Sequence, residues 1–153
     1  MKRIAALLLT TALVLTLSSA LARKAECPSG GFSLKLPDSF EEQPLDSGDP
    51  DMCFYWENGS ITIVGYRYYQ GEIPGSSVFQ VTTGNESADE TVTVRGKQMH
   101  RDTGTDSFGT YIMYTWMDRG NSVTLYFYYP KGDSSARKSV ENIMSSISFD
   151  AGH

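Results

Sequence analysis

One stretch near the C-terminus constrains the fold more than any other part of the chain. Residues 109–118 and 122–129 (GTYIMYTWMD and SVTLYFYY) are rich in aromatic and β-branched side chains, and Arg119-Gly120-Asn121 joins them. Two such runs around a short connection that contains glycine predict a pair of long antiparallel strands. Because successive side chains of a strand point to opposite faces, this hairpin has two distinct surfaces.

We assign the core to the face that holds most of the branched aliphatic side chains. With a two-residue turn, that face consists of Ile112, Tyr114, Trp116, Val123, Leu125 and Phe127. The other face carries Tyr111, Met113, Thr115, Met117, Thr124, Tyr126 and Tyr128. This second face is either covered by a helix or open for contacts with another molecule, to which tyrosines are well suited.

The remaining strands complete an antiparallel sheet. Alternation and composition predict strands at 32–36, 52–57, 60–69, 91–95 and 97–102, with a turn at 103–107. Asn58-Gly59 indicates a two-residue hairpin turn, which pairs Trp56 with Ile61. Residues 76–83 fit either a short helix or a strand.

The chain closes with a helix. Asp133 or Ser134 can cap it, and apolar residues then recur at helical spacing at Ala136, Val140, Ile143, Met144 and Ile147. We therefore expect an α+β fold, an antiparallel sheet of about six strands with the C-terminal helix packed on it.

The first 22 residues have the features of a cleavable secretory signal peptide. Lys2 and Arg3 precede an apolar run at 4–17, and Ala20-Leu21-Ala22 supplies the small residues of a cleavage site. A helix needs about 20 apolar residues to span a bilayer, so a permanent anchor is the weaker interpretation. We expect a signal peptide at 1–22 and one exported domain at 23–153, ordered from about 27 to 149 and not inserted in a membrane after cleavage.

The charge of the exported domain limits the class of partner. The leader holds two of the 13 Lys and Arg residues and none of the 18 Asp and Glu residues, which leaves a domain with a net charge of −7. This charge, and the scatter of the basic residues, argue against nucleic acid and against anionic membrane surfaces. We expect the domain to be secreted or extracytoplasmic, in the periplasm or at the exterior of a bacterial cell, with a protein or glycan of the envelope as partner.

Cys27 and Cys53 are the only cysteines. In an oxidising compartment they favour a single intramolecular disulfide, with two free thiols as the alternative. The bond would close a loop of about 25 residues and restrict the unfolded chain by about 3 kcal/mol. Two cysteines are too few for a structural zinc site, which usually takes about four ligands. We expect neither a metal nor a cofactor.

The sequence patterns assign no catalytic residue. His100-Arg101-Asp102 has the composition of a catalytic tripeptide, but a His–Asp pair needs a nucleophile, and no serine lies in a G-x-S-x-G turn. Asp102 and Asp106 flank a predicted turn and could form an acid pair. A hydrolase that acts on envelope material through Asp102, Asp106 or His100 is therefore an alternative function.

The order of the elements resembles one known family. "GFSLKLPDSF" is a strand that runs into an LP-x-x-F phrase, the two long strands read "GTYIMYTWMDRGNSVTLYFYYP", and the closing helix reads "SSARKSVENIMSSISF". Over most of residues 31–149 this order resembles the PsbP-like α/β/α sandwich. The resemblance implies that fold and a largely non-enzymatic role, because family members are extrinsic photosystem subunits, binding partners of small GTPases and exported bacterial proteins of unknown role.

These observations favour a non-catalytic exported binding module. Its candidate interaction surface is formed by Tyr111, Met113, Tyr126 and Tyr128, because an exposed tyrosine combines a large apolar area with a polar tip. A structural or assembly-assisting subunit, as some PsbP-like proteins are, is a further alternative.

Overall fold

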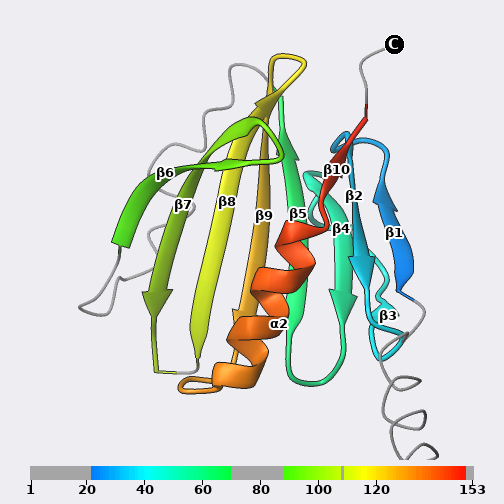
Figure 1. The fold of residues 1–153 in the computed structure, drawn as a ribbon. Coiled ribbons are helices and arrows are strands. Elements are labelled where there is room, and N and C mark those ends of the chain that lie inside the picture. The colour runs from blue at the N-terminus through cyan, green and yellow to red at the C-terminus, as the bar shows by residue number, and fades with distance from the viewer. Residues whose placement is uncertain (1–21, 70–87, 108, 151–153) are drawn as a thin grey trace, which may run out of the picture.

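The computed structural model describes residues 22–69, 88–107 and 109–150. Within these ranges, ten strands form two sheets, and a helix and the smaller sheet lie against one face of the larger sheet (Figure 1). The predicted signal peptide, apart from Ala22, and the ambiguous segment at 76–83 fall outside the described residues. In the described part of the chain, the helix is too short and too polar to cross a membrane.

The larger sheet has seven strands, each antiparallel to its neighbours, in the order β3-β4-β5-β9-β8-β7-β6. In chain order these strands are β3 (Glu41–Glu42), β4 (Met52–Glu57), β5 (Thr62–Tyr68), β6 (Ala88–Val94), β7 (Lys97–Thr105), β8 (Thr110–Asp118) and β9 (Asn121–Tyr129). The strands predicted in this part of the chain are all present. The predicted turn at 103–107 is wrong, because β7 continues to Thr105.

The hairpin of β8 and β9 has the predicted faces. Arg119 and Gly120 form its turn with φ angles of 48° and 80°, the left-handed geometry that matches the twist of the flanking strands. Trp116 lies opposite Val123 in the register. The six side chains predicted to form the core are each at most 5% exposed, which confirms the assignment.

The predicted register of the β4–β5 hairpin is wrong by two residues. Trp56 lies opposite Ile63 rather than Ile61. The cause is the side chain of Asn58, whose Oδ1 accepts hydrogen bonds from the N–H groups of Ser60 (3.1 Å) and Ile61 (2.8 Å) and so keeps Ile61 in the turn. A shift of two residues leaves Trp56 and Ile63 on their predicted face, where both are buried. Cys53 is an exception: a β-bulge between Met52 and Phe54 changes the alternation, and Cys53 packs against the core instead of sharing the face of Tyr55 as predicted.

The sequence does not predict the smaller sheet. β1 (Arg23–Cys27), β2 (Phe32–Leu36) and β10 (Ser148–Phe149) pair in the order β1-β2-β10. The described residues therefore hold ten strands, more than the predicted six or so. The apolar alternation of β1 is confined to Ala25 and Cys27, among three charged residues, and β3 and β10 have two residues each.

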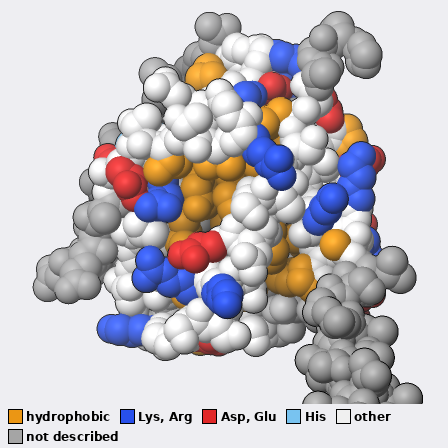
Figure 2. Space-filling model, viewed as in Figure 1, with side chains coloured by type: hydrophobic (Ala, Val, Ile, Leu, Met, Phe, Trp, Pro, Cys, Tyr) orange, Lys and Arg blue, Asp and Glu red, His pale blue; other side chains and the backbone are white. Residues whose placement is uncertain are grey.

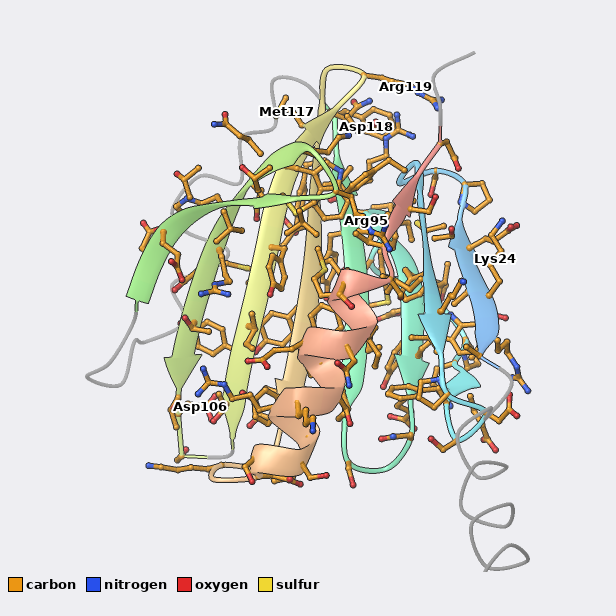
Figure 3. All side chains as sticks on the ribbon, viewed as in Figure 1. Lys24, Arg95, Asp106, Met117, Asp118 and Arg119 are labelled. Carbon is orange, nitrogen blue, oxygen red and sulfur yellow. The ribbon has the colours of Figure 1, made fainter. Side chains whose placement is uncertain are left out.

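The structure confirms the predicted C-terminal helix. α2 (Ser134–Ser145) begins after Asp133, whose Oδ1 accepts a hydrogen bond from the N–H of Ala136 (2.8 Å). Its apolar stripe is buried against the sheets and consists of Ala136, Val140, Ile143 and Met144. At the other end, Arg95 reaches the helix from the β6–β7 turn (Figure 3), and its Nε donates to the carbonyl oxygen of Ser145 (3.1 Å).

Candidate functional site

The predicted aromatic surface is a continuous layer of tyrosine rings on the face of the larger sheet opposite α2. Alternate residues of β5, β8 and β9 build this tyrosine face, which we define as Tyr66, Tyr68, Tyr111, Met113, Tyr126 and Tyr128. The rings of Tyr126 and Tyr128 stack with centroids 6.2 Å apart, and those of Tyr111 and Tyr126 with centroids 5.8 Å apart. Tyr66 and Tyr68 form a third stacked pair at 6.1 Å.

Three of the four residues predicted for an interaction surface keep accessible area. Met113, Tyr126 and Tyr128 are half-buried, whereas Tyr111 is only 2% exposed. Tyr111 is buried over Gly104, its cross-strand partner on β7. The helix α2 packs on the other face of the sheet, on the side of β2 and β9 core residues, so it does not cover these tyrosines. Tyr111 therefore packs beneath the surface, and the accessible area belongs to Met113, Tyr126 and Tyr128.

Lys and Arg side chains are absent from the tyrosine face in the strands of the larger sheet that the structure describes. Between β4 and the end of β9 the chain has five Lys and Arg residues: Arg67, Arg95, Lys97, Arg101 and Arg119. Arg95 and Arg119 lie in turns. The other three have the strand parity of the core, since Arg67 is opposite Val123, Arg101 is opposite Tyr114, and Lys97 lies over the ring of Phe149.

Carboxylates, in contrast, share the tyrosine face or border it. Asp102 and Glu57 occupy strand positions of the same parity as the tyrosines. Asp106 lies in the β7–β8 loop, at the end of the sheet away from Met117 (Figure 3), and its Oδ1 accepts a hydrogen bond from the Tyr128 hydroxyl (3.2 Å). The surface therefore combines phenol rings with negative charge.

Burial and these carboxylates raise the pKa values of the tyrosines. Partial burial is the larger cause for Tyr126, with Asp106 as the next, and both raise its pKa well above the ordinary value. Burial, Tyr66 and Asp49 raise the pKa of Tyr68 to about 12. The phenols are therefore neutral hydrogen-bond donors at neutral pH.

The residues of the hydrolase alternative make different contacts, although His100 is close enough to Asp102 to oppose the rise that burial causes in its pKa. The Nε2 of His100 lies 2.8 Å from Oδ1 of Asp89 on β6, so its carboxylate partner is Asp89 and not Asp102. Asp106 accepts a hydrogen bond from the N–H of Gly109 (2.8 Å), as a turn residue does. Burial and the charge of Asp89 raise the pKa of Asp102. The hydrolase alternative is not tested by these contacts and stays a prediction.

The two cysteines lie side by side as thiols. Sγ of Cys27 on β1 is 3.0 Å from Sγ of Cys53 on β4, farther than a disulfide bond of about 2.05 Å. The hydrogen bond between the two thiol groups is the main cause that lowers the pKa of Cys27 to about 7, and Ser29 and Arg67 act in the same direction. The same interaction, together with burial, raises the pKa of Cys53.

A cleft that the sequence does not predict lies beside α2. This helix-side cleft has a volume of about 340 Å³ and is lined by Arg101, Thr103, Gly104, Thr105, Thr110, Ile112, Tyr114, Tyr129, Arg137 and Glu141. Figure 2 shows it as a hollow with an apolar floor between acidic and basic side chains. Its lining residues come from three strands and the helix, so no local sequence pattern indicates the cleft. The wrong prediction of a turn at 103–107 also excludes Thr103, Gly104 and Thr105 from β7, where they line the cleft.

The fold defines a class of protein, in which a large antiparallel sheet carries a helix and a smaller sheet on one face. No family model matches the chain, and neither does any curated protein. The chain is similar to the solution structure of the cyanobacterial PsbP of Synechocystis sp. PCC 6803, with a TM-score of 0.63 and 11% identity over 88% of this chain and 95% of that one. The PsbP-like resemblance is thus confirmed, for the fold alone.

A second solved structure, from Bacteroides thetaiotaomicron, is a more distant match. Its TM-score is 0.49 at 14% identity, and the match covers 84% of this chain. The chain spans 48% of that protein's length. We draw no argument from this likeness.

Proposed function

We propose that the chain is a non-catalytic, exported binding module whose tyrosine face engages a positively charged protein partner. The observation that supports this proposal is that the tyrosine face carries carboxylates without Lys or Arg, whereas the other face of the larger sheet carries both kinds of charge, as in the pair of Arg101 and Glu90. Asp102, Asp106 and Glu57 lie on or beside the tyrosine face, while the Lys and Arg side chains of the described strands lie on the other face or in turns.

The chemistry of this face matches Lys and Arg side chains. A cation over an exposed aromatic ring gains about 0.5–1 kcal/mol, and neighbouring carboxylates add attraction at longer range. The half-buried rings of Tyr126 and Tyr128 also offer apolar area at low entropic cost. A neutral glycan could stack on the rings, but it would gain nothing from the carboxylates, so the charge favours a basic protein over a glycan.

A basic peptide rich in lysine and arginine tests this proposal by fluorescence anisotropy at low and high salt. We compare Asp102→Asn/Asp106→Asn with Glu26→Gln/Glu141→Gln, whose exposed carboxylates lie on β1 and α2. Both pairs change the net charge equally. If each border carboxylate contributes about 0.5 kcal/mol, the first pair weakens binding about fivefold and the second leaves it nearly unchanged.

The tyrosines are tested in the same assay. Tyr126→Ala and Tyr128→Ala should each weaken peptide binding, while Tyr69→Ala should not, because Tyr69 is an exposed ring outside the tyrosine face. Equal effects of the two carboxylate pairs would mean that the peptide senses only net charge. That result, or binding that is insensitive to Tyr126 and Tyr128, would refute the proposed surface.

We also propose that the leader is removed on export and that Cys27 and Cys53 are then oxidised. The two thiols lose two protons and two electrons, their sulfur atoms join, and the disulfide of an oxidant in that compartment accepts the electrons and protons and becomes a dithiol. The bond would link β1 of the smaller sheet to β4 of the larger one, where the two sulfur atoms are already neighbours. Intact mass should show a chain that starts near Arg23 and gains two hydrogens on reduction; thiol labelling of the native exported protein at both cysteines would contradict the bond.

A further inference from the structure

We infer that the helix-side cleft binds a small carboxylate that carries an apolar body, such as an aryl or branched alkyl acid. The cleft lies on the face of the larger sheet opposite the tyrosine face, because its residues on β7 and β8 have the strand parity of the core. The inference therefore goes beyond the proposed function and does not depend on it.

The floor of the cleft accepts the apolar body. It is formed by the edges of Ile112, Tyr114 and Tyr129, which are each at most 5% exposed and so lie deep in the hollow. Figure 2 shows this apolar floor open to the surface beside the helix. A volume of about 340 Å³ is at the lower end of the range for ligand pockets, so the ligand is small.

The polar groups of the cleft favour an anion. Its lining contains two guanidinium groups, Arg101 from β7 and Arg137 from α2, and one carboxylate, Glu141. The hydroxyl groups of Thr103, Thr105 and Thr110 lie in the same wall and add hydrogen-bond donors. The lining alone therefore holds one more positive than negative charge, while Glu90, which does not line the cleft, pairs with Arg101.

Both arginines keep donor capacity for a ligand. Arg101 contacts Glu90 through Nη2, and its side chain is 36% exposed, although its Nε is buried and has no hydrogen-bond partner among the described residues. Arg137 pairs with Glu141 at 3.3 Å through Nε, and both side chains are more than half exposed. A guanidinium has about five N–H donors, and exposed ion pairs of this kind are weak, so a ligand carboxylate can add to them or replace them.

A monocarboxylate fits this arrangement better than a phosphate does. Glu90 and Glu141 remain beside the two guanidinium groups, and they repel a dianion more strongly than a monoanion. The planar carboxylate also matches the forked geometry of a guanidinium. The apolar floor adds affinity only for an acid with a hydrocarbon body.

Phenylacetate tests the inference, with phenylacetamide and inorganic phosphate as comparisons, in amide NMR titrations of the full exported domain. At the efficiency usual for small ligands, we expect phenylacetate to bind with a Kd of about 1 mM. The affected amides should be those of the cleft strands and the start of α2, including Thr103, Thr105 and Thr110. Phenylacetamide should bind at least about tenfold more weakly, because it lacks the charge.

Variants of the two arginines identify the recognising groups. Arg101→Gln and Arg137→Gln should each weaken phenylacetate binding about tenfold, the loss expected for a charge-assisted hydrogen bond. Lys138→Gln is the matched control, because Lys138 is exposed on the same helix and does not line the cleft. The tyrosine-face variants Tyr126→Ala and Tyr128→Ala should leave this binding unchanged, so failure of one proposal is distinguishable from failure of the other.

Four outcomes would overturn the inference. They are equal binding of the amide, equal binding of inorganic phosphate, amide shifts outside the cleft, and arginine variants that bind as the Lys138 control does. A thermal unfolding curve for each variant separates lost binding from lost folding. Glu141→Gln serves as a second check, since removal of the competing carboxylate should strengthen phenylacetate binding by several-fold.

Discussion

Replacing Gly104 with alanine should destabilise the protein by overpacking a tyrosine ring. Gly104 lies opposite Tyr111 in the β7–β8 register, and an added Cβ would lie 2.4 Å from both Cζ and the hydroxyl oxygen of Tyr111. The ring cannot move aside freely, because it is 2% exposed and stacks on Tyr126. Overpacking of a well-packed site costs about 1–3 kcal/mol, and we expect Gly104→Ala to fall in this range.

A double-mutant cycle isolates the contact. In a Tyr111→Leu background the clash is gone, and alanine should be neutral or stabilising by about 0.5–1 kcal/mol, because glycine is unfavourable in a strand. The coupling free energy between the two positions should therefore be about 1–4 kcal/mol. Urea unfolding followed by the fluorescence of Trp56 and Trp116, which are both buried, measures all four proteins. The explanation fails if Gly104→Ala alone stays within about 0.5 kcal/mol of the parent, or if Tyr111→Leu does not change its effect.

Two further predictions concern the helix cap and the phenols. Asp133→Ala should lower the free energy of unfolding by about 0.5–2 kcal/mol, while Ser134→Ala one position later should have a smaller effect; urea unfolding compares them, and equal losses would contradict the role of Asp133 as cap. The raised pKa of Tyr68 favours its neutral form in the folded protein, so the associated stability is complete below the ordinary pKa near 10 and is lost as pH rises toward about 12. Ultraviolet titration should show phenols that ionise above the ordinary value, and a midpoint near 10 for every tyrosine would refute this.

The parts of the fold that depend on short-range pattern are predictable from the sequence. The faces of the β8–β9 hairpin follow from alternation and from a two-residue turn at Arg119-Gly120. The helix follows from its apolar spacing and from Asp133. In the hairpin and in the helix, the spacing of apolar residues along the chain agrees with the side chains that the complete fold buries. Residues close in sequence are therefore enough to predict both elements.

The wrong predictions, of the β4–β5 register and of the turn at 103–107, arise where a side-chain contact overrides the structure that the local sequence usually forms. Asn58-Gly59 is a strong hairpin signal, but the Asn58 side chain takes the N–H groups of Ser60 and Ile61 and lengthens the turn. Gly104 appears in the sequence as a turn residue, yet it lies within β7, where the Tyr111 ring fills the space that a side chain would occupy. Such a pairing becomes visible only when the strand register is known.

The candidate sites also divide into features that follow from the local sequence pattern and features that depend on tertiary contacts. Met113, Tyr126 and Tyr128 belong to one hairpin, so alternation places them on one face, and the structure leaves them partly accessible. The helix-side cleft joins Arg101 on β7 to Arg137 on α2, across a tertiary contact that no short window of sequence contains. Alternation does not reveal the burial of Tyr111 either, because it depends on a glycine in the next strand.

The strand β7 links the two proposed surfaces through its alternation. Arg101, Thr103 and Thr105 point to the helix-side cleft, while His100 and Asp102 share the parity of the tyrosine face. A slip of one residue in the β7–β8 register would exchange these sets, and would place a cation among the tyrosines and a carboxylate over the apolar floor. The fit of Tyr111 over Gly104 opposes this slip, because a one-residue shift would bring Tyr111 against the side chain of Thr103 or Thr105. The Gly104–Tyr111 contact therefore keeps the chemistry of the two faces separate, and its loss should change ligand binding on both.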